Sequence, residues 1–146
     1  MGKFDKASKI ADYFSGTLFL SQNNYIESYK YLKKLDGLEE SHNAYSSKYL
    51  FSLINSGNLN QAFYFSKKLE KNNQDSYESN LIMGIYYLKN SNYEISKNYF
   101  LKAQQKTQNL VLDRFVAQSL YIWSDIKKKN NSLEKAKLSL NKLDAR

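Results

Sequence analysis

The chain has 146 residues, a formal net charge of +8, 13 Tyr, no Cys and no Pro. This length is enough for one domain with a sizeable core, and the absence of Cys excludes disulfides and thiolate metal sites. No apolar run reaches the roughly 20 residues that span a bilayer, so the sequence predicts a single soluble domain over residues 1–146, cytoplasmic or periplasmic, with no transmembrane segment.

The first third of the chain predicts one helical hairpin and the start of a second. Apolar residues at helical spacing predict a helix from about Lys6 to Ser21, and another helix begins after Asn24. Asn24 and Glu27 have the spacing of a capping box, in which each side chain bonds the backbone of the other residue. Gly37 is expected to end that helix in the left-handed conformation that suits glycine.

The next two hairpins repeat this arrangement. Gly57 marks the end of a helix that begins near Ser41, and Asn58 is placed to cap the helix that follows. Asp75 is placed to open the third hairpin, whose second helix runs from Tyr93 to about Lys106.

The fourth hairpin is irregular. Its second-helix residues Ala136, Leu140 and Leu143 follow the matching residues of the third hairpin by 40 positions instead of 34. We place the extra residues in its first helix, from Leu110 to about Lys129. The prediction is an all-α fold of eight helices in four hairpins, with units of about 9–42, 43–76, 77–110 and 111–146.

The strongest pattern in the sequence is a recurrence every 34 residues. An amide residue followed by a large apolar one starts three helices, at Asn24, Asn58 and Asn92. Four positions later each helix has a small residue, where the two helices of a hairpin must approach closely. A fixed period of this length indicates stacked helical repeats.

This pattern resembles the tetratricopeptide repeat, a 34-residue helical hairpin with small residues where its two helices meet. The matching residues are Gly16, Phe19, Tyr25, Ser28, Leu32 and Leu35, then Leu53, Leu59, Ala62 and Leu69, then Met83, Gly84, Tyr87, Tyr93, Ser96, Phe100 and Ala103. The chain departs from the family pattern at Ser28 and Ser96 (usually Ala), Leu50 (usually Gly) and Ser66 (usually aromatic). The resemblance implies a right-handed superhelix, or α-solenoid, that serves as a protein-binding scaffold within a longer bacterial-type protein.

In the repeat family the first helices line a concave groove. The resemblance assigns to this groove the residues at recurring first-helix positions and one neighbouring lysine: Tyr13, Thr17, Leu20, Ser47, Lys48, Phe51, Ile54, Leu81, Ile85 and Leu88. The set is mostly apolar, which fits recognition of a partner helix or apolar segment. It lacks the rows of Lys, Arg and Asn with which part of the family binds C-terminal carboxylates. The open alternative is that a short, tight superhelix packs these side chains against one another.

Lysines form a second pattern on the second helices. Lys34, Lys68, Lys102 and Lys142 occupy one position in all four units, and are expected to form a basic ridge on the convex side. Such a ridge attracts nucleic acid, anionic lipid or an acidic protein without specificity. We favour a solvated face over nucleic-acid binding, because the chain has 20 Lys and only 2 Arg, and Arg makes the bidentate contacts of nucleic-acid readout.

Little in the sequence supports catalysis. His42 is the only His, Cys is absent, and no Gly-rich phosphate loop or metal-ligand spacing occurs. We therefore expect no catalytic residue, no metal site, no cofactor and no enzyme activity, and favour binding of a protein or peptide partner. The first alternative is homo-oligomerisation through the C-terminal hairpin, which no polar helix caps. The second is electrostatic binding through the lysine ridge.

Overall fold

The structure is a computed structural model that describes residues 3–107 and 111–144, with side chains at 6–107 and 111–134. The part of the chain so described is all-helical, which confirms the predicted class. It contains α1 (Lys3–Ser21), α2 (Tyr25–Leu32), α3 (Asn43–Asn55), α4 (Leu59–Lys71), α5 (Tyr77–Lys89), α6 (Tyr93–Lys106) and α7 (Val111–Asp144), with the 3₁₀ helices η1 (Lys33–Leu35) and η2 (Leu38–Glu40) between α2 and α3.

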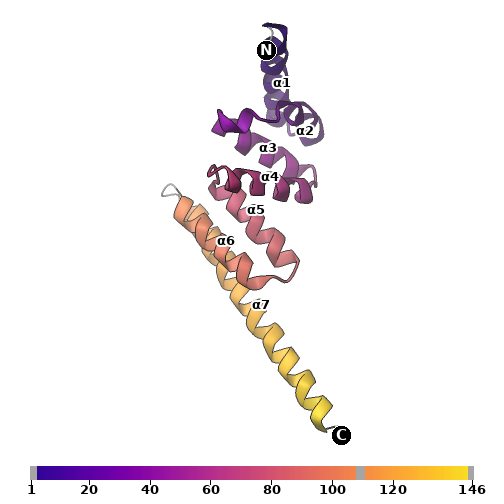
Figure 1. The fold of residues 1–146 in the computed structure, drawn as a ribbon, viewed down its shortest axis with the longest axis vertical. Coiled ribbons are helices and arrows are strands. Elements are labelled where there is room, and N and C mark those ends of the chain that lie inside the picture. The colour runs from indigo at the N-terminus through magenta and orange to yellow at the C-terminus, as the bar shows by residue number, and fades with distance from the viewer. Residues whose placement is uncertain (1–2, 108–110, 145–146) are drawn as a thin grey trace.

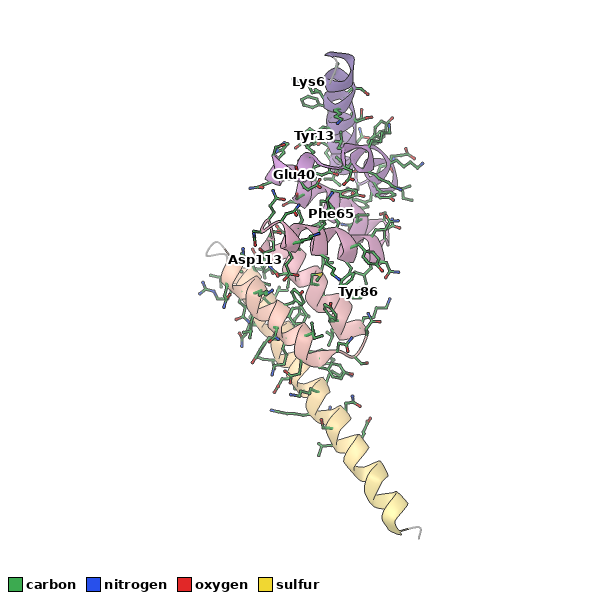
Figure 2. All side chains as sticks on the ribbon, in the orientation of Figure 1. Lys6, Tyr13, Glu40, Phe65, Tyr86 and Asp113 are labelled. Atoms are coloured by element: carbon green, nitrogen blue, oxygen red, sulfur yellow. The ribbon has the colours of Figure 1, made fainter. Side chains whose placement is uncertain are left out.

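The helices stack along one long axis. Figure 1 shows α1 at one end, α3, α4 and α5 in the middle, and α7 running beside α6 before it projects past the rest of the molecule. Helices that follow one another in the sequence contact one another, most extensively α5 with α6 and α6 with α7. Figure 2 shows Phe65 of α4 and Tyr86 of α5 within this stack, and Lys6 near its outer end.

The three hairpin turns have the same geometry at 34-residue spacing. The second residue after each first helix has a positive φ, and the amide of the next residue donates to the carbonyl oxygen five residues before it, which is the Schellman arrangement. The positive-φ residues are Asn23, Gly57 and Ser91, and the donors are Asn24, Asn58 and Asn92, with N···O distances of 2.8 to 2.9 Å. The recurrence in the sequence is therefore also a recurrence in backbone geometry.

The two helices of the first and third hairpins approach closely at a glycine. A Cβ atom added to Gly16 would lie 2.7 Å from the side chain of Leu32, and one added to Gly84 would lie 2.4 Å from the ring of Phe100. Atoms do not approach this closely without displacement. Each glycine therefore makes room for a large, fully buried residue on the second helix.

The second hairpin has the opposite arrangement at the same repeat positions. The first helix carries the large residue, Leu50, and the second helix carries the small one, Ser66, and both are buried. Leu50 and Ser66 both depart from the expected pattern, but the two departures compensate each other, because the larger side chain on the first helix faces a smaller one on the second.

The main hydrophobic core lies between α2, α3, α4 and the start of α5. Its buried members are Leu32, Leu35, Tyr45, Leu50, Leu53, Ala62, Phe65, Leu69 and Ile82. Tyr45 is fully buried and donates its hydroxyl to the carbonyl oxygen of Leu32 at 3.1 Å, so its polar atom is satisfied.

The predicted helix ends are partly confirmed. Asn24 caps α2, since its Oδ1 accepts from the Glu27 backbone at 3.3 Å, and Gly37 adopts a φ of 95° after η1. Asn58 occupies the N-cap position of α4 as predicted, but its side chain makes no bond to the start of that helix. Its Nδ2 donates instead to Ser56 Oγ at 2.8 Å.

The cap predicted for α5 is wrong by one residue. Ser76 occupies the capping position, and Ser76 and Ser79 each bond the backbone of the other at 3.2 and 2.8 Å. Asp75 instead accepts a hydrogen bond from the side chain of Asn80 at 2.9 Å. A Ser-x-x-Ser pair satisfies the same orphan amides as the more familiar Ser-x-x-Glu pair.

The predicted fourth hairpin is wrong. α7 continues for 34 residues through the segment 129–132, where a turn was expected, so the described chain has seven α-helices and not eight. No Gly or Pro interrupts this segment. Asp125 pairs with Lys129 at 2.9 Å, and Ser132 Oγ bonds the carbonyl oxygen of Lys128 at 3.0 Å. Both contacts follow helical spacing and support continuation of the helix.

Candidate partner-binding groove

Three of the predicted groove residues are exposed apolar side chains. They are Phe51 and Ile54 on α3 and Ile85 on α5. Phe51 is 53 % exposed and Ile85 is 38 % exposed, and they occupy the same repeat position on successive first helices. Tyr25 meets the ring of Phe51 edge-on, with centroids 5.9 Å apart. Exposed apolar surface therefore recurs from α3 to α5.

The other predicted groove residues on α1 are more covered. Tyr13 packs against the core and lies 5.1 Å, centroid to centroid, from the ring of His42. Thr17 Oγ1 is buried and has no hydrogen-bond partner among the described residues. Leu20 is half-buried, so α1 contributes little exposed apolar surface at these positions.

The remaining predicted groove residues on α3 and α5 differ in their exposure. Lys48, Leu81 and Leu88 are half-buried, while Ser47 is exposed. Among the predicted groove residues, the exposed apolar set is therefore Phe51, Ile54 and Ile85.

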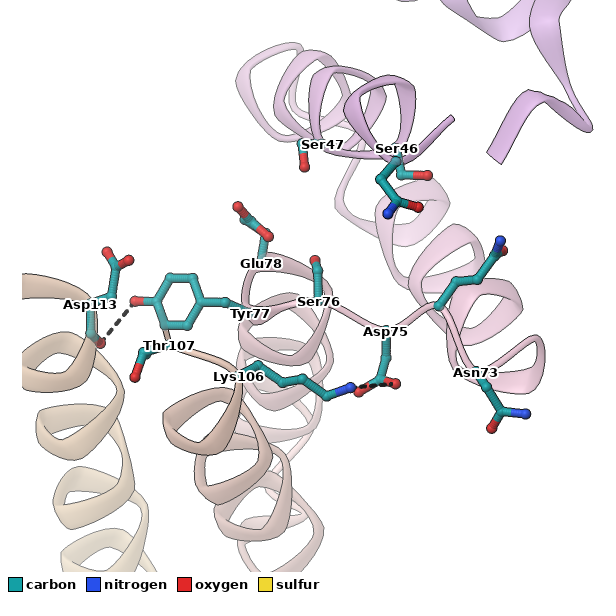
Figure 3. A pocket seen from close by; sticks show the side chains of 12 residues that line it. Ser46, Ser47, Asn73, Asp75, Ser76, Tyr77, Glu78, Lys106, Thr107 and Asp113 are labelled. Atoms are coloured by element: carbon teal, nitrogen blue, oxygen red, sulfur yellow. Dashed lines mark hydrogen bonds and ion pairs between the residues drawn. The ribbon is translucent and has the colours of Figure 1, made fainter. Parts of the chain in front are cut away.

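A polar cavity of about 550 Å³ lies at the N-terminal ends of α3 and α5. Figure 3 shows Ser47 on α3, Glu78 on α5 and Asp113 on α7 facing this space. The lining residues are Asn43, Ser46, Ser47, Asn73, Gln74, Asp75, Ser76, Tyr77, Glu78, Lys106, Thr107 and Asp113. Ser47 belongs both to the predicted groove and to the cavity. Glu78 also lies at a first-helix position that the repeat resemblance assigns to the groove. The other lining residues were not predicted as site residues, because they come from the starts and ends of five helices and the loops beside them.

The cavity carries more negative than positive charge. Lys106 pairs with Asp75 at 3.2 Å, whereas Glu78 and Asp113 make no ion pair among the described side chains. Burial acts to raise the pKa of Asp75, but hydrogen bonds from Asn80 and Lys106 outweigh it and lower that pKa. The Asp75 carboxylate is therefore ionised at neutral pH, in a chain whose net charge is +8.

A tyrosine hydrogen bond connects two of the helices that line the cavity. Tyr77 donates its hydroxyl to the backbone oxygen of Asp113 at 3.0 Å (Figure 3). Burial, with the nearby charges of Asp113 and Glu78, raises the pKa of Tyr77. This bond ties the start of α5 to the start of α7 across the cavity.

The lysines of the basic ridge form ion pairs with carboxylates of the same chain. Lys68 pairs with Asp36 at 2.8 Å and Lys102 pairs with Glu70 at 2.6 Å. Both members of the first pair lie 34 residues before those of the second. Each pair joins a second helix to the end of the preceding one, and we call these two contacts the ion-pair ladder.

The remaining ridge lysines lie outside this ladder. Lys34 pairs with Asp12 of α1 at 3.0 Å, and the side chain of Lys142 lies outside the described residues. All three described ridge lysines therefore have a carboxylate partner. The recurrence of Lys-x-Asp and Lys-x-Glu at 34–36 and 68–70 is the sequence signal from which the ladder was predictable.

Glu39 is a buried charge that no sequence pattern singled out. It is fully buried, accepts from the Gly37 amide at 2.9 Å and forms an ion pair with Lys68. Hydrogen bonds to Asp36 and Glu39 raise the pKa of Lys68. Lys68 therefore holds two carboxylates, whereas its repeat equivalent Lys102 holds one.

Comparisons of the chain with protein-family models, curated proteins and solved structures find no match. Across the described residues, no group of three or more His, Asp or Glu is placed to hold a metal ion, and no helix there is both long and apolar enough to cross a membrane. The groove and the cavity are therefore judged on their own geometry.

Proposed function

We propose that this chain is a non-enzymatic scaffold of the tetratricopeptide-repeat type, a right-handed superhelix that binds a partner protein or peptide along the first helices. The observation that carries this proposal is the exposure of Phe51 and Ile85 at one repeat position. Large apolar side chains aligned on successive repeats offer a continuous contact surface, unlike scattered exposed residues.

Two features support the repeat family. The hairpin turns recur every 34 residues with one backbone geometry, through Asn23, Gly57 and Ser91. The close helix approach at Gly16 and Gly84 also recurs at twice that period. Both features match the small-residue contact and short turn of the repeat family.

The groove suits a partner with an apolar face and a basic residue. Phe51, Ile54 and Ile85 would be buried by an apolar helix or extended segment. Beside Ser47, the cavity presents the carboxylates of Glu78 and Asp113, which would attract a Lys or Arg side chain of the partner.

The ion pairs of the ridge lysines favour the groove over electrostatic binding through the ridge. Lys34, Lys68 and Lys102 each have a carboxylate within 3.0 Å. An anionic partner would have to displace these contacts, so the net attraction of the ridge is reduced.

The experiment that tests the groove compares affinity capture from cell extract by three purified proteins. These are the native chain, a Phe51→Asp, Ile85→Asp variant, and a control variant with Tyr64→Asp and Ile95→Asp. The control residues are large side chains on the second helices α4 and α6 that are at least as exposed as Phe51 and Ile85, respectively. Circular dichroism establishes that all three are folded.

We expect a protein that the native chain and the control capture but the groove variant does not. Titration of that purified protein should show at least tenfold weaker binding to the groove variant, since each introduced carboxylate would be desolvated in the interface. Equal capture by the groove variant and the native chain would contradict the proposal.

A further inference from the structure

α7 carries an apolar stripe on the face that points away from α6. Ala117 and Ser124 are fully buried where α7 packs on α6, and Ser124 Oγ lies 3.1 Å from Ser96 Oγ. On the opposite face, Leu112 is 71 % exposed and Phe115 is 68 % exposed. The stripe continues through Ile122, Ile126 and Leu133, all exposed. Five large apolar side chains in one line form a surface that requires an occupant.

The stripe has the spacing of a coiled coil. One set of residues recurs every seven positions, and a second set follows each of them by three. The sets are Leu112, Ser119, Ile126, Leu133 and Leu140, and Phe115, Ile122, Lys129, Ala136 and Leu143. Such spacing over five heptads is typical of a helix that pairs with another helix along its length. The side chains of the last three members lie outside the described residues, so their register rests on the sequence and on the continuous backbone of α7.

We propose that α7 pairs with α7 of a second copy of this chain in an antiparallel coiled coil. In this register the segment 129–143 of each copy covers the segment 112–126 of the other. Residues of matching size then face one another across the two helices. The facing pairs are Leu112 with Leu143, Phe115 with Leu140, Ser119 with Ala136, and Ile122 with Leu133.

Charge favours the antiparallel register over the parallel one. A parallel pair would place Lys129 of one copy against Lys129 of the other, within the contact. In the antiparallel pair Lys129 faces Ile126, and its ammonium group already pairs with Asp125 of its own helix at 2.9 Å. The lysine stem then covers apolar surface while its charge stays at the edge.

The pairing also makes, between two copies, the helix–helix contacts that the predicted fourth hairpin would have made within one chain. Residues 133–144 carry the second-helix pattern of α4, with Leu133, Ala136 and Lys142-Leu143-Asp144 matching Leu59, Ala62 and Lys68-Leu69-Glu70. In a single chain these residues project away from the body on α7 (Figure 1). Exchange of such an element between two copies is a low-cost route to a dimer.

The body of each copy does not obstruct this contact. α6 covers the face of α7 that bears Ala117 and Ser124, opposite to the stripe. α7 is about 50 Å long at the helical rise of 1.5 Å per residue, so the two bodies lie at opposite ends of the paired helices. The surface is separate from the groove on α3 and α5, and the inference stands independently of the proposed function.

Sedimentation of the full chain at several concentrations tests the dimer. We expect twice the 17.1 kDa mass of one chain. Ile122→Glu should weaken the dimer more than tenfold, because it places a carboxylate in the apolar contact. Ile95→Glu, at an exposed apolar residue of α6, should leave the dimer unchanged. A monomer at every concentration, or a dimer that Ile122→Glu does not weaken, would overturn the proposal.

Cysteine cross-linking tests the register, because the native chain has no Cys. A mixture of the single variants Ser119→Cys and Ala136→Cys should form a disulfide between the two different chains under oxidising conditions. Cross-linking of Ser119→Cys to itself would indicate a parallel pair and overturn the antiparallel register. A disulfide formed within one chain of the double variant, in a monomer, would instead indicate a closed fourth hairpin.

Discussion

Ser96 Oγ donates a hydrogen bond to the backbone oxygen of Gly84 across the third hairpin, at 2.9 Å. The same bond joins Ser28 to Gly16 in the first hairpin, at 2.8 Å. Both serines are fully buried, so the bond satisfies a hydroxyl that would otherwise be orphaned. The helices of these two hairpins are thus closest where a glycine carbonyl faces a serine, and bulk on the first helix is excluded there.

This contact predicts that the effect of Gly84→Leu on stability depends on the residue it faces, at position 100, and reverses when that residue is made small. In the native chain it should destabilise by at least about 1–3 kcal/mol, since the new side chain would overlap the ring of Phe100. In a Phe100→Ser background it should stabilise, because the pair then reproduces Leu50 and Ser66 of the second hairpin. A double-mutant cycle from urea unfolding measures both effects. Destabilisation in both backgrounds would show that the exchange of volume is not transferable between hairpins.

The ion-pair ladder predicts unequal effects at two equivalent lysines. Lys68→Gln should lower the free energy of unfolding by about 1–3 kcal/mol or more, because it leaves the fully buried Glu39 without its counter-charge. Lys102→Gln is the matched control at the same repeat position. It should cost only about 0.2–1 kcal/mol, as for other exposed pairs. Equal costs from urea unfolding would mean that Glu39 does not depend on Lys68.

The buried Tyr45 and the half-buried Tyr49 predict a loss of stability at alkaline pH. Burial, together with Tyr29, Asp36 and Glu39, raises the pKa of Tyr49 from 10.0 to about 12, and burial raises the pKa of Tyr45 in the same direction. Because the folded state holds these protons more tightly, the contribution of both tyrosines is complete below pH 10, and that of Tyr49 is lost as pH rises toward about 12.

The measurement is the free energy of unfolding from neutral pH upward. Tyr49→Phe should flatten the decline above pH 10, since the group no longer titrates, whereas Tyr64→Phe, at an exposed ring, should leave the decline unchanged. An identical decline in the native chain and Tyr49→Phe would exclude Tyr49 as a source of the alkaline transition.

Alanine substitution of two predicted groove aromatics should lower the free energy of unfolding by different amounts. Tyr13 packs against the core and His42, so Tyr13→Ala should lower the free energy of unfolding by about 2 kcal/mol. Phe51 is more than half exposed, so Phe51→Ala should cost less than about 1 kcal/mol. Thermal unfolding of the two variants is sufficient. A larger loss for Phe51→Ala would make Phe51 a packing residue and remove it from the groove.

The candidate site was only partly predictable from the sequence. The repeat positions identified Phe51, Ile54 and Ile85, which are exposed, but the same positions on α1 gave Thr17 and Leu20, which are more covered. Periodicity identifies a face of a helix, but the exposure of that face depends on what the neighbouring element places against it. The cavity as a whole was not predicted, since its charged residues meet only when α5, α6, α7 and the loop before α5 are assembled.

The sequence by itself determined the first three hairpins. Short-range rules act within a few residues, so Gly37, Gly57 and the amide residues at 24, 58 and 92 were sufficient to locate the turns. The tertiary structure alone decided the rest. Whether Lys68 is a solvated ridge residue or the counter-charge of buried Glu39 depends on a contact between residues 29 positions apart in the sequence. Local rules do not specify which side chains the packing of helices brings together, so they could not show that Glu39 is buried or that Lys68 pairs with it.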